Sequence, residues 1–154
     1  METISHAVDD QGSCPESRNS QRPQAVDLNV FLDTSALVKR YIPERGSDKV
    51  YAVMNDADRI AVSVICLPEL ASSLSRLVRE ERLKVADRDF IKQEALADLT
   101  DADICQVTPE VVASAIKLIE SNALRTLDAI HVASAATLGS ELFVSAPSVN
   151  TNTT

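Results

Sequence analysis

The sequence predicts an α/β fold in which helices cover a parallel sheet. Four short apolar runs, typical of strands buried on both faces, lie at residues 28–32, 60–65, 104–107 and 142–146. The segments between these runs carry apolar residues at helical intervals. Because strands that alternate with helices are joined by right-handed crossovers, such strands form a parallel sheet.

Length and composition predict one domain with two tails. A chain of 154 residues suits a single domain with a substantial core. Residues 1–28 are rich in Ser, Gln, Asp and Pro, so we expect a flexible tail and not a secretory signal. The domain is expected to span 29–146, followed by an irregular tail at 147–154. No apolar run approaches the roughly 20 residues of a membrane span, so no membrane partner is expected.

Cysteine content and charge narrow the function classes. The three cysteines are odd in number and share no close spacing, which disfavours a disulfide framework or a zinc knuckle and favours a reducing cytoplasm. A net charge of −8 argues against a broad cationic surface for nucleic acid. A nucleic-acid enzyme can still work through a bound metal and a local basic strip. The candidates for that strip are Lys39, Arg40 and Arg45 after the first strand, and Arg76, Arg79, Arg82 and Lys84 along one helix. Each is also explained as part of a solvated helix face.

The first strand ends at an acid. Asp33, Thr34 and Ser35 follow the apolar run and precede helical spacing, so we expect Asp33 to cap a helix at the carboxyl end of the strand. Open parallel sheets place their working groups in the crevice at this end. Asp33 is therefore either only a helix cap or a functional acid, and other acids at matching positions decide between the two.

Two further helices are expected to begin near an acid. Pro68 lies near the first helical position after the strand at 60–65, and Glu69 then falls in the first turn. Thr126 is the expected cap of a later helix, with Asp128 in its first turn. Taken alone, Glu69 is explained equally well by the helix dipole, which favours a negative charge at this end.

The remaining helices continue the alternation. The segment 47–58 carries apolar residues at helical intervals. Asp87 is the expected cap of a helix over 88–99, in which Phe90 is one of the inward residues. Residues 108–110, with the sequence Thr-Pro-Glu, are expected to begin another helix.

Taken together, Asp33, Glu69 and Asp128 predict a metal site. Each falls where a helix starts, and two or more of them are expected to converge on one edge of the sheet. Converging carboxylates repel unless they are protonated or bridged by a cation. Hard oxygen ligands suit Mg²⁺ or Mn²⁺, which keep several waters for a phosphate substrate. Such an ion activates water and stabilises the charge that develops on a phosphodiester.

His131 has two explanations. Three positions after Asp128, it either supports the site, as a group that bonds to a metal ligand or as a proton donor, or it is a packed, hydrogen-bonded histidine within an apolar helix. A Ser–His–Asp hydrolase is disfavoured because the chain lacks a Gly-x-Ser-x-Gly motif. With three glycines in total, it also lacks a phosphate loop and a dinucleotide fingerprint.

Three segments of the chain resemble the PIN domain, in particular the VapC-type toxin ribonucleases: residues 30–41, 69–74 and 127–135. The resemblance implies a three-layer α/β/α sandwich around a parallel sheet. It also implies Mg²⁺-dependent cleavage of single-stranded RNA. The partners it implies are a cognate antitoxin protein that masks the site and a second copy of the chain in a homodimer.

The resemblance carries over to particular residues of this chain. Asp33, Glu69 and Asp128 match the first three acids of the family's metal site, so they are the expected catalytic residues and ligands of Mg²⁺ or Mn²⁺. Thr34 and Ser145 match its supporting hydroxyl groups.

The carboxyl end departs from this family. Where the family has a hydroxyl residue, one further residue and a fourth acid, this chain has Ser145, Ala146 and Pro147. No acid follows Glu141, and the expected final helix and strand are missing. Two hypotheses therefore stand. The chain is a ribonuclease that works with three acids and has impaired activity, or it is a catalytically inactive PIN-like module that binds an antitoxin or RNA without cleavage.

Overall fold

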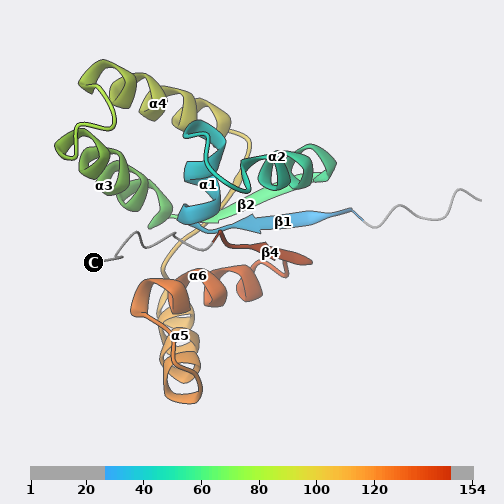
Figure 1. Cartoon of the computed structure of the whole chain (residues 1–154). Helices are drawn as coiled ribbons and strands as arrows, with labels where there is room; N and C mark the ends of the chain where they lie inside the picture. The colour runs from blue at the N-terminus through green and yellow to red at the C-terminus, as the bar shows by residue number, and fades with distance from the viewer. Residues whose placement is uncertain (1–26, 147–154) are drawn as a thin grey trace, which may run out of the picture.

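The computed structural model describes residues 27–146 (Figure 1). Most of the expected tail at 1–28, the whole of the expected tail at 147–154, and with it Pro147, lie outside the described residues. In chain order the elements are β1 (Asn29–Leu32), α1 (Thr34–Tyr41), α2 (Ser47–Asp56), β2 (Arg59–Ser63), α3 (Cys66–Arg79), α4 (Val85–Asp98), β3 (Asp103–Cys105), α5 (Pro109–Ser121), α6 (Thr126–Thr137) and β4 (Leu142–Val144).

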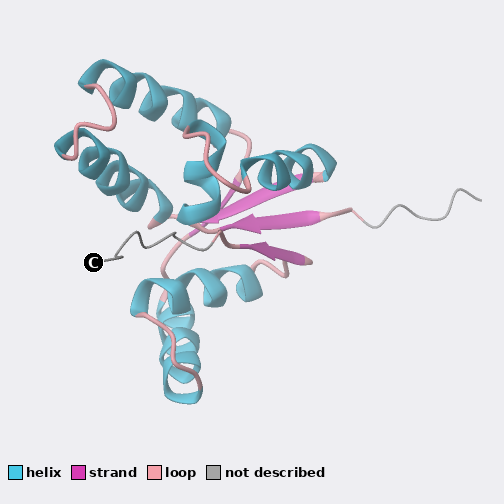
Figure 2. Cartoon of the chain, in the orientation of Figure 1, coloured by secondary structure: helices cyan, strands magenta, loops and turns pink. Residues whose placement is uncertain are grey.

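The strands form one parallel sheet in the order β3-β2-β1-β4 (Figure 2). In the central strand β1, Phe31 aligns with Ala61 of β2 and with Phe143 of β4. Because all the strands run the same way, their carboxyl ends lie at one edge of the sheet. Helices cover both faces, which confirms the predicted three-layer α/β/α architecture (Figure 1).

Helices α1 to α4 cover the face drawn uppermost in Figure 1 and form the upper layer. Successive side chains on β1 point to opposite faces, so Val30 and Leu32 face this layer. Each helix adds apolar residues at intervals of three or four positions. The buried residues of this upper core are Val30, Leu32, Ala36, Leu37, Val50, Val62, Cys66, Leu70, Leu74, Ile91, Ala95, Leu99 and Ala146.

Helices α5 and α6 cover the opposite face and form the lower layer (Figure 1). Here Phe31 is the one large side chain from β1, and most of its buried neighbours are alanines. The buried residues of this lower core are Phe31, Ala61, Cys105, Val111, Ala115, Ala129, Ala133 and Ala135.

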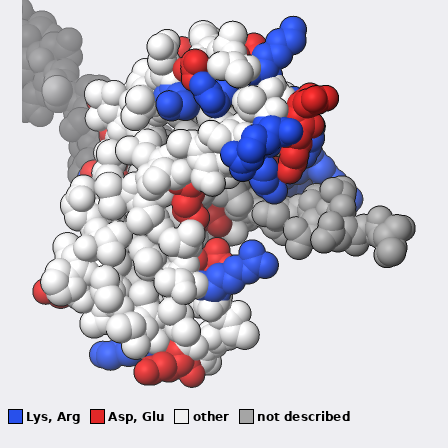
Figure 3. Space-filling view, turned by 90° about the vertical axis from the view of Figure 1, so that its left-hand side faces the viewer, with Lys and Arg blue, Asp and Glu red and all other residues white. Residues whose placement is uncertain are grey.

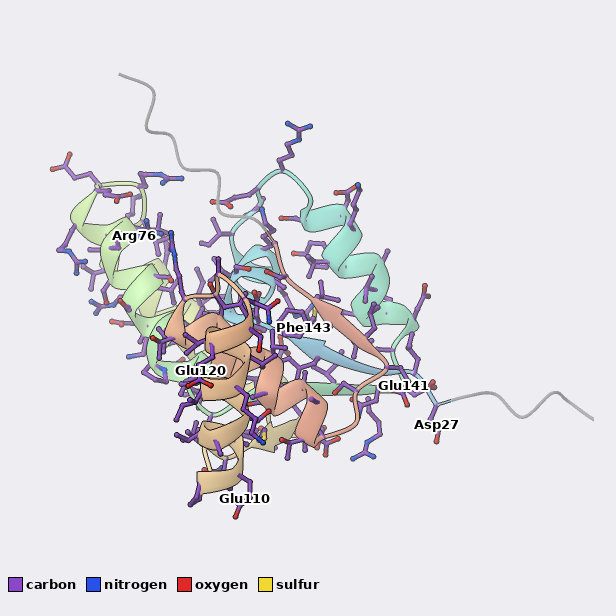
Figure 4. The ribbon with its side chains drawn as sticks, turned by 90° about the horizontal axis from the view of Figure 1, so that it is seen from below. Asp27, Arg76, Glu110, Glu120, Glu141 and Phe143 are labelled. Carbon is purple, nitrogen blue, oxygen red and sulfur yellow. The ribbon has the colours of Figure 1, made fainter. Side chains whose placement is uncertain are left out.

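Strand β4 lies at the edge of the sheet and is fixed to β1 at two points (Figure 4). At its start, Oε2 of Glu141 accepts a hydrogen bond from the backbone N–H of Asn29 at 2.8 Å. Further along, the ring of Phe143 stacks on Phe31 with 5.7 Å between the ring centroids. The carboxyl end of β4 is thereby held beside that of β1.

The structure corrects two expectations about α4. The helix begins at Val85, so Lys84 occupies the cap position, and the predicted cap Asp87 lies instead in the first turn, where the helix dipole favours an acid. Phe90 was expected to face inward, but it is 63% exposed. The buried side of α4 is centred on Ile91, and a residue one position away points about 100° around the helix.

Two other helix starts can be compared with the expectations. The helix expected to begin at residues 108–110 is α5, and Thr108 caps it, because its hydroxyl accepts a hydrogen bond from the N–H of Val111. Thr126 is the first residue of α6 and Arg125 is at the cap position, so the expectation for Thr126 is wrong by one residue. Over residues 27–146, none of the helices combines the length and the apolar character needed to cross a membrane.

Candidate metal centre

Asp33 lies where β1 ends and α1 begins. Its Oδ1 accepts a hydrogen bond from the N–H of Ala36 at 2.9 Å and another from the hydroxyl of Ser35 at 2.6 Å. The predicted helix cap is therefore confirmed. Within residues 27–146, Oδ2 of Asp33 accepts no hydrogen bond, so capping leaves one carboxylate oxygen free for a ligand.

Glu69 lies in the first turn of α3, directly after β2. Its Oε2 accepts a hydrogen bond from Oγ1 of Thr34 at 2.6 Å and lies 2.6 Å from Nε2 of His131. Burial acts to raise the pKa of this carboxyl group, but the hydrogen bonds from His131 and Thr34 outweigh it and hold the pKa below its ordinary value. Glu69 is thus kept ionised and bonded to α1 and α6 at once.

His131 faces inward from α6. It is 3% exposed, and its ring meets that of Phe31 edge-on with 6.2 Å between the centroids. Its Nε2 also lies 3.3 Å from Oγ1 of Thr34. The ring is packed and hydrogen-bonded, as one explanation expects, and its partner is a candidate acid, as the explanation of a group that supports the site expects.

Asp128 is less closely associated with the site than Asp33 and Glu69. It lies in the first turn of α6, one turn before His131, and it is exposed. In the part of the chain that the structure describes, no three His, Cys, Asp or Glu side chains form a group ready to hold a metal ion. The structure therefore joins the starts of α1, α3 and α6 through Thr34, Glu69 and His131, without closing the three acids into one ligand cluster.

Ser35 is a member of the site that the sequence pattern did not reveal. Its hydroxyl donates to Oδ1 of Asp33 and accepts a hydrogen bond from the N–H of Ala146 at 2.9 Å. The chain that leaves β4 is thereby tied to Asp33. Ser145, which the family resemblance matched to a supporting hydroxyl, is exposed. The available signal was the position of Ser35 two residues after Asp33, which brings its hydroxyl within reach of the capping carboxylate.

The basic residues nearest to Asp33 in sequence are engaged elsewhere. Lys39 is 5% exposed, and its Nζ donates to the carbonyl oxygen of Arg45 at 2.8 Å. Arg40 donates from Nε to Oδ2 of Asp98 at 2.8 Å. The expectation that Lys39 and Arg40 contact a substrate phosphate is therefore wrong, because both side chains serve to hold structure away from Asp33.

Arg76, another basic candidate, is on the same helix as Glu69. It lies seven residues after Glu69 on α3, which places both residues on the same side of the helix, and it is exposed. Figure 4 shows its side chain on the side of α3 that faces α6. Figure 3, which looks onto the carboxyl ends of the strands, shows acidic side chains gathered in the middle of this face, with Lys and Arg side chains above and beside them.

Comparisons with known proteins show relatives of this chain and solved structures of similar fold. Ribonuclease VapC45 and ribonuclease VapC49, from two strains of Mycobacterium tuberculosis, are each 31% identical to this chain over 115 residues, covering 71% of it and 76% of the relative. The crystal structure of M. tuberculosis VapC20, a sarcin-ricin loop cleaving toxin, is 15% identical, with a TM-score of 0.58 over 78% of this chain and 91% of that one.

A second solved structure has a similar fold. A toxin–antitoxin complex from Klebsiella pneumoniae contains a chain 18% identical to this one, with a TM-score of 0.53 over 73% of this chain and 82% of that chain. The family model for the PIN domain matches residues 30–146, a range that includes every strand and helix of the described structure except Asn29, the first residue of β1. The chain belongs to the PIN domain family.

Proposed function

We propose that this chain is a metal-dependent endoribonuclease that cleaves single-stranded RNA as the toxin of a toxin–antitoxin pair. The observation that carries the proposal is the meeting of three helix starts at the carboxyl edge of the sheet. There Glu69 bonds to Thr34, the neighbour of Asp33, and to His131, one turn from Asp128. The likeness to relatives named as VapC ribonucleases supports the same activity.

The donor chemistry of the site fits a hard divalent cation. Among the described residues, Oδ2 of Asp33 and Oε1 of Glu69 are carboxylate oxygens without a hydrogen-bond donor, and Asp128 is open to solvent. Carboxylates without a cation repel one another, so their spread is compatible with such a site. We expect Asp33 and Asp128 to bind Mg²⁺ or Mn²⁺ directly, and Glu69 to bind it directly or through water. A bound ion supplies an activated water and neutralises charge on the phosphodiester.

The other groups of the chain orient this site and its substrate. Ser35 and the N–H of Ala36 fix one oxygen of Asp33, which holds the carboxylate in a single orientation. Arg76 offers an exposed guanidinium group on the same side of α3 as Glu69, suited to a phosphate of the RNA backbone. A few local cations suffice for this purpose even though the whole chain carries a net charge of −8.

The proposed partners follow from the relatives. A solved neighbour of similar fold is part of a toxin–antitoxin complex, and we therefore expect a cognate antitoxin protein that covers the acidic face and blocks RNA. We also expect a homodimer, as the family resemblance implies, and a cytoplasmic location, as the cysteine content indicates.

Replacing Asp33 by Asn tests the proposed activity. The change keeps the cap oxygen but removes the negative charge that a cation needs, so Mn²⁺-dependent cleavage of a single-stranded RNA pool should fall by about 100-fold or more, beyond the loss typical of a supporting group. Asp87→Asn is the matched control, because it removes the same charge from an exposed position in α4. Equal metal-dependent cleavage by Asp33→Asn and the unmodified chain would disprove the proposed site.

A catalytically inactive PIN-like module that binds antitoxin or RNA is the second candidate function. Two observations favour it: the described residues hold no ready group of three metal ligands, and Pro147 stands where the family has its fourth acid. Pro147→Asp separates the two functions. If this variant alone cleaves RNA, the scaffold is sound and the natural chain is inactive, whereas cleavage by the unmodified chain that Asp33→Asn abolishes supports a three-acid enzyme.

A further inference from the structure

The two oxygens of the Glu69 carboxylate have different surroundings. Oε2 receives the hydroxyl of Thr34 at 2.6 Å and faces Nε2 of His131 at 2.6 Å. Within residues 27–146, Oε1 has no hydrogen-bond donor. A carboxylate that is fixed through one oxygen by two donors from different helices has little freedom to rotate. The orientation of the other oxygen, Oε1, is therefore fixed as well.

The two ring nitrogens of His131 also differ. Nε2 points at the ionised Glu69 and must donate a hydrogen bond to it. Nδ1 is fully buried and has no hydrogen-bond partner in the described part of the chain. Nε2 is therefore the ring nitrogen through which His131 bonds to other residues of the described chain. The bond to Glu69 requires a proton on Nε2.

The packing around His131 fixes the direction in which Nε2 points. Phe31 meets the imidazole edge-on from β1, and Ala135, one turn further along α6, is buried against the same strand residue. The ring is 3% exposed, so water does not compete for Nε2. This environment gives the His131–Glu69 bond a defined geometry before any ligand arrives.

We propose that His131 is a positioning residue that, together with Thr34, fixes Oε2 of Glu69 so that Oε1 alone is available to the metal centre. The inference rests on the proposed function, because it gives Glu69 its place in that centre. It assigns His131 no proton transfer to RNA. It requires one donor at the place of Nε2, and it predicts that the donor and not the imidazole ring itself is needed.

Mn²⁺ affinity of two substitutions at His131 tests this requirement. His131→Leu introduces an apolar side chain of similar length that has no hydrogen-bond donor. The amide of His131→Gln, in contrast, retains an N–H near the position of Nε2. We expect His131→Leu to weaken Mn²⁺ binding, measured by calorimetry, by about 10- to 100-fold, the usual effect of losing a group that supports a ligand. His131→Gln should recover most of the affinity.

Ser134→Ala is the matched control for these variants. Ser134 is on the same helix, is fully buried, and has a hydroxyl without a hydrogen-bond partner among the described residues. Its loss should leave Mn²⁺ affinity unchanged. Equal weakening by His131→Leu and His131→Gln at an unchanged melting temperature would overturn the proposal, because retaining the donor would then have no effect.

Nitrogen NMR of the unmodified chain gives an independent measurement that needs no substitution. We expect His131 to show a proton on Nε2 in the absence of metal. An Nε2 without a proton would overturn the proposal even if the variants at His131 fail to fold. Failure of the proposed function is a different outcome: the unmodified chain would then bind no Mn²⁺. Binding that Asp33→Asn abolishes and His131→Leu leaves intact would overturn only the role of His131.

Discussion

The two faces of the sheet are built from side chains of very different size. The upper core is filled by branched aliphatic residues of four helices, such as Leu37 and Leu74. The lower core lies under two helices and is lined mainly by alanines, with Phe31 as its one large side chain from the central strand. The upper layer therefore has the larger apolar contact area and should supply most of the folding stability.

The small residues of the lower core serve a geometric purpose. Ala135 on α6 and Ala61 on β2 pack together with Phe31, and these small side chains let the helix backbone lie close to the sheet. Because α6 lies close to the sheet, Nε2 of His131 lies within 2.6 Å of Oε2 of Glu69, which belongs to α3 in the opposite layer. Stability and site assembly are thus divided between the two faces, and mutations in each face should separate the two properties.

A cavity in the upper core should have the largest effect on stability. Leu74 on α3 is fully buried, so Leu74→Ala should lower the free energy of unfolding by about 3 kcal/mol through lost burial and an unfilled cavity. Urea unfolding measures this change. Leu96→Ala is the control, because Leu96 is 55% exposed. Mn²⁺ affinity of the folded Leu74→Ala chain should stay close to that of the unmodified chain, and a loss as large as that of Asp33→Asn would contradict the division of roles.

Overpacking the lower core should affect the site more than stability. Ala133 is fully buried and packs with Val111 and Ala115 of α5 and with Cys105 of β3, so Ala133→Leu should lower the free energy of unfolding by about 2 kcal/mol and displace α6 from these neighbours. Since α6 carries His131 and Asp128, Mn²⁺ affinity should fall by about 10-fold or more at temperatures where the variant is fully folded. The control is Ala136→Leu on the exposed side of the same helix. Unchanged Mn²⁺ affinity in Ala133→Leu would mean that close packing of α6 against its neighbours is not needed for metal binding.

The sequence predicts those parts of this arrangement that depend on neighbouring residues. The apolar run 30–32 followed by Asp33 predicts a buried strand and a capped helix, and both are observed. The alternation of strands and helices predicts the parallel sheet. In each case the physical signal, burial on both faces or a side-chain oxygen at a helix start, lies within a few residues of the structure that it specifies.

The contacts across the layers could not be predicted in the same way. Glu69 and His131 are 62 residues apart, and α6 is apolar around most of its circumference, so periodicity does not say which side meets the sheet. The wrong expectation for Phe90 has the same origin. Neighbouring helix positions point about 100° apart, so Phe90 is exposed although Ile91, the next residue, is buried. Lys39 is buried because its long side chain reaches the carbonyl of Arg45, a contact that no local pattern reveals.

The two buried cysteines allow the opening rates of the two faces of the sheet to be compared. Cys66 belongs to the upper core and Cys105 to the lower core. Burial raises the pKa of the Cys66 thiol to about 11, from an ordinary value of 9.0, so at pH 8 the folded chain holds almost none of it as reactive thiolate. Alkylation of Cys66 therefore requires the upper core to open.

In a Cys14→Ser background, mass spectrometry can follow the alkylation of each buried thiol at pH 8. We expect Cys105 to react first, because it is 6% exposed under the thinner layer while Cys66 is fully buried. Leu74→Ala should accelerate the reaction of Cys66 more than that of Cys105, and Ala133→Leu should do the reverse. Equal rates at both thiols in all three chains, matching the rate of global unfolding, would mean that the two faces open as one cooperative unit. The lower layer would then be as firmly held as the upper one, and the alanine-lined contact would contribute stability as well as the approach of His131 to Glu69.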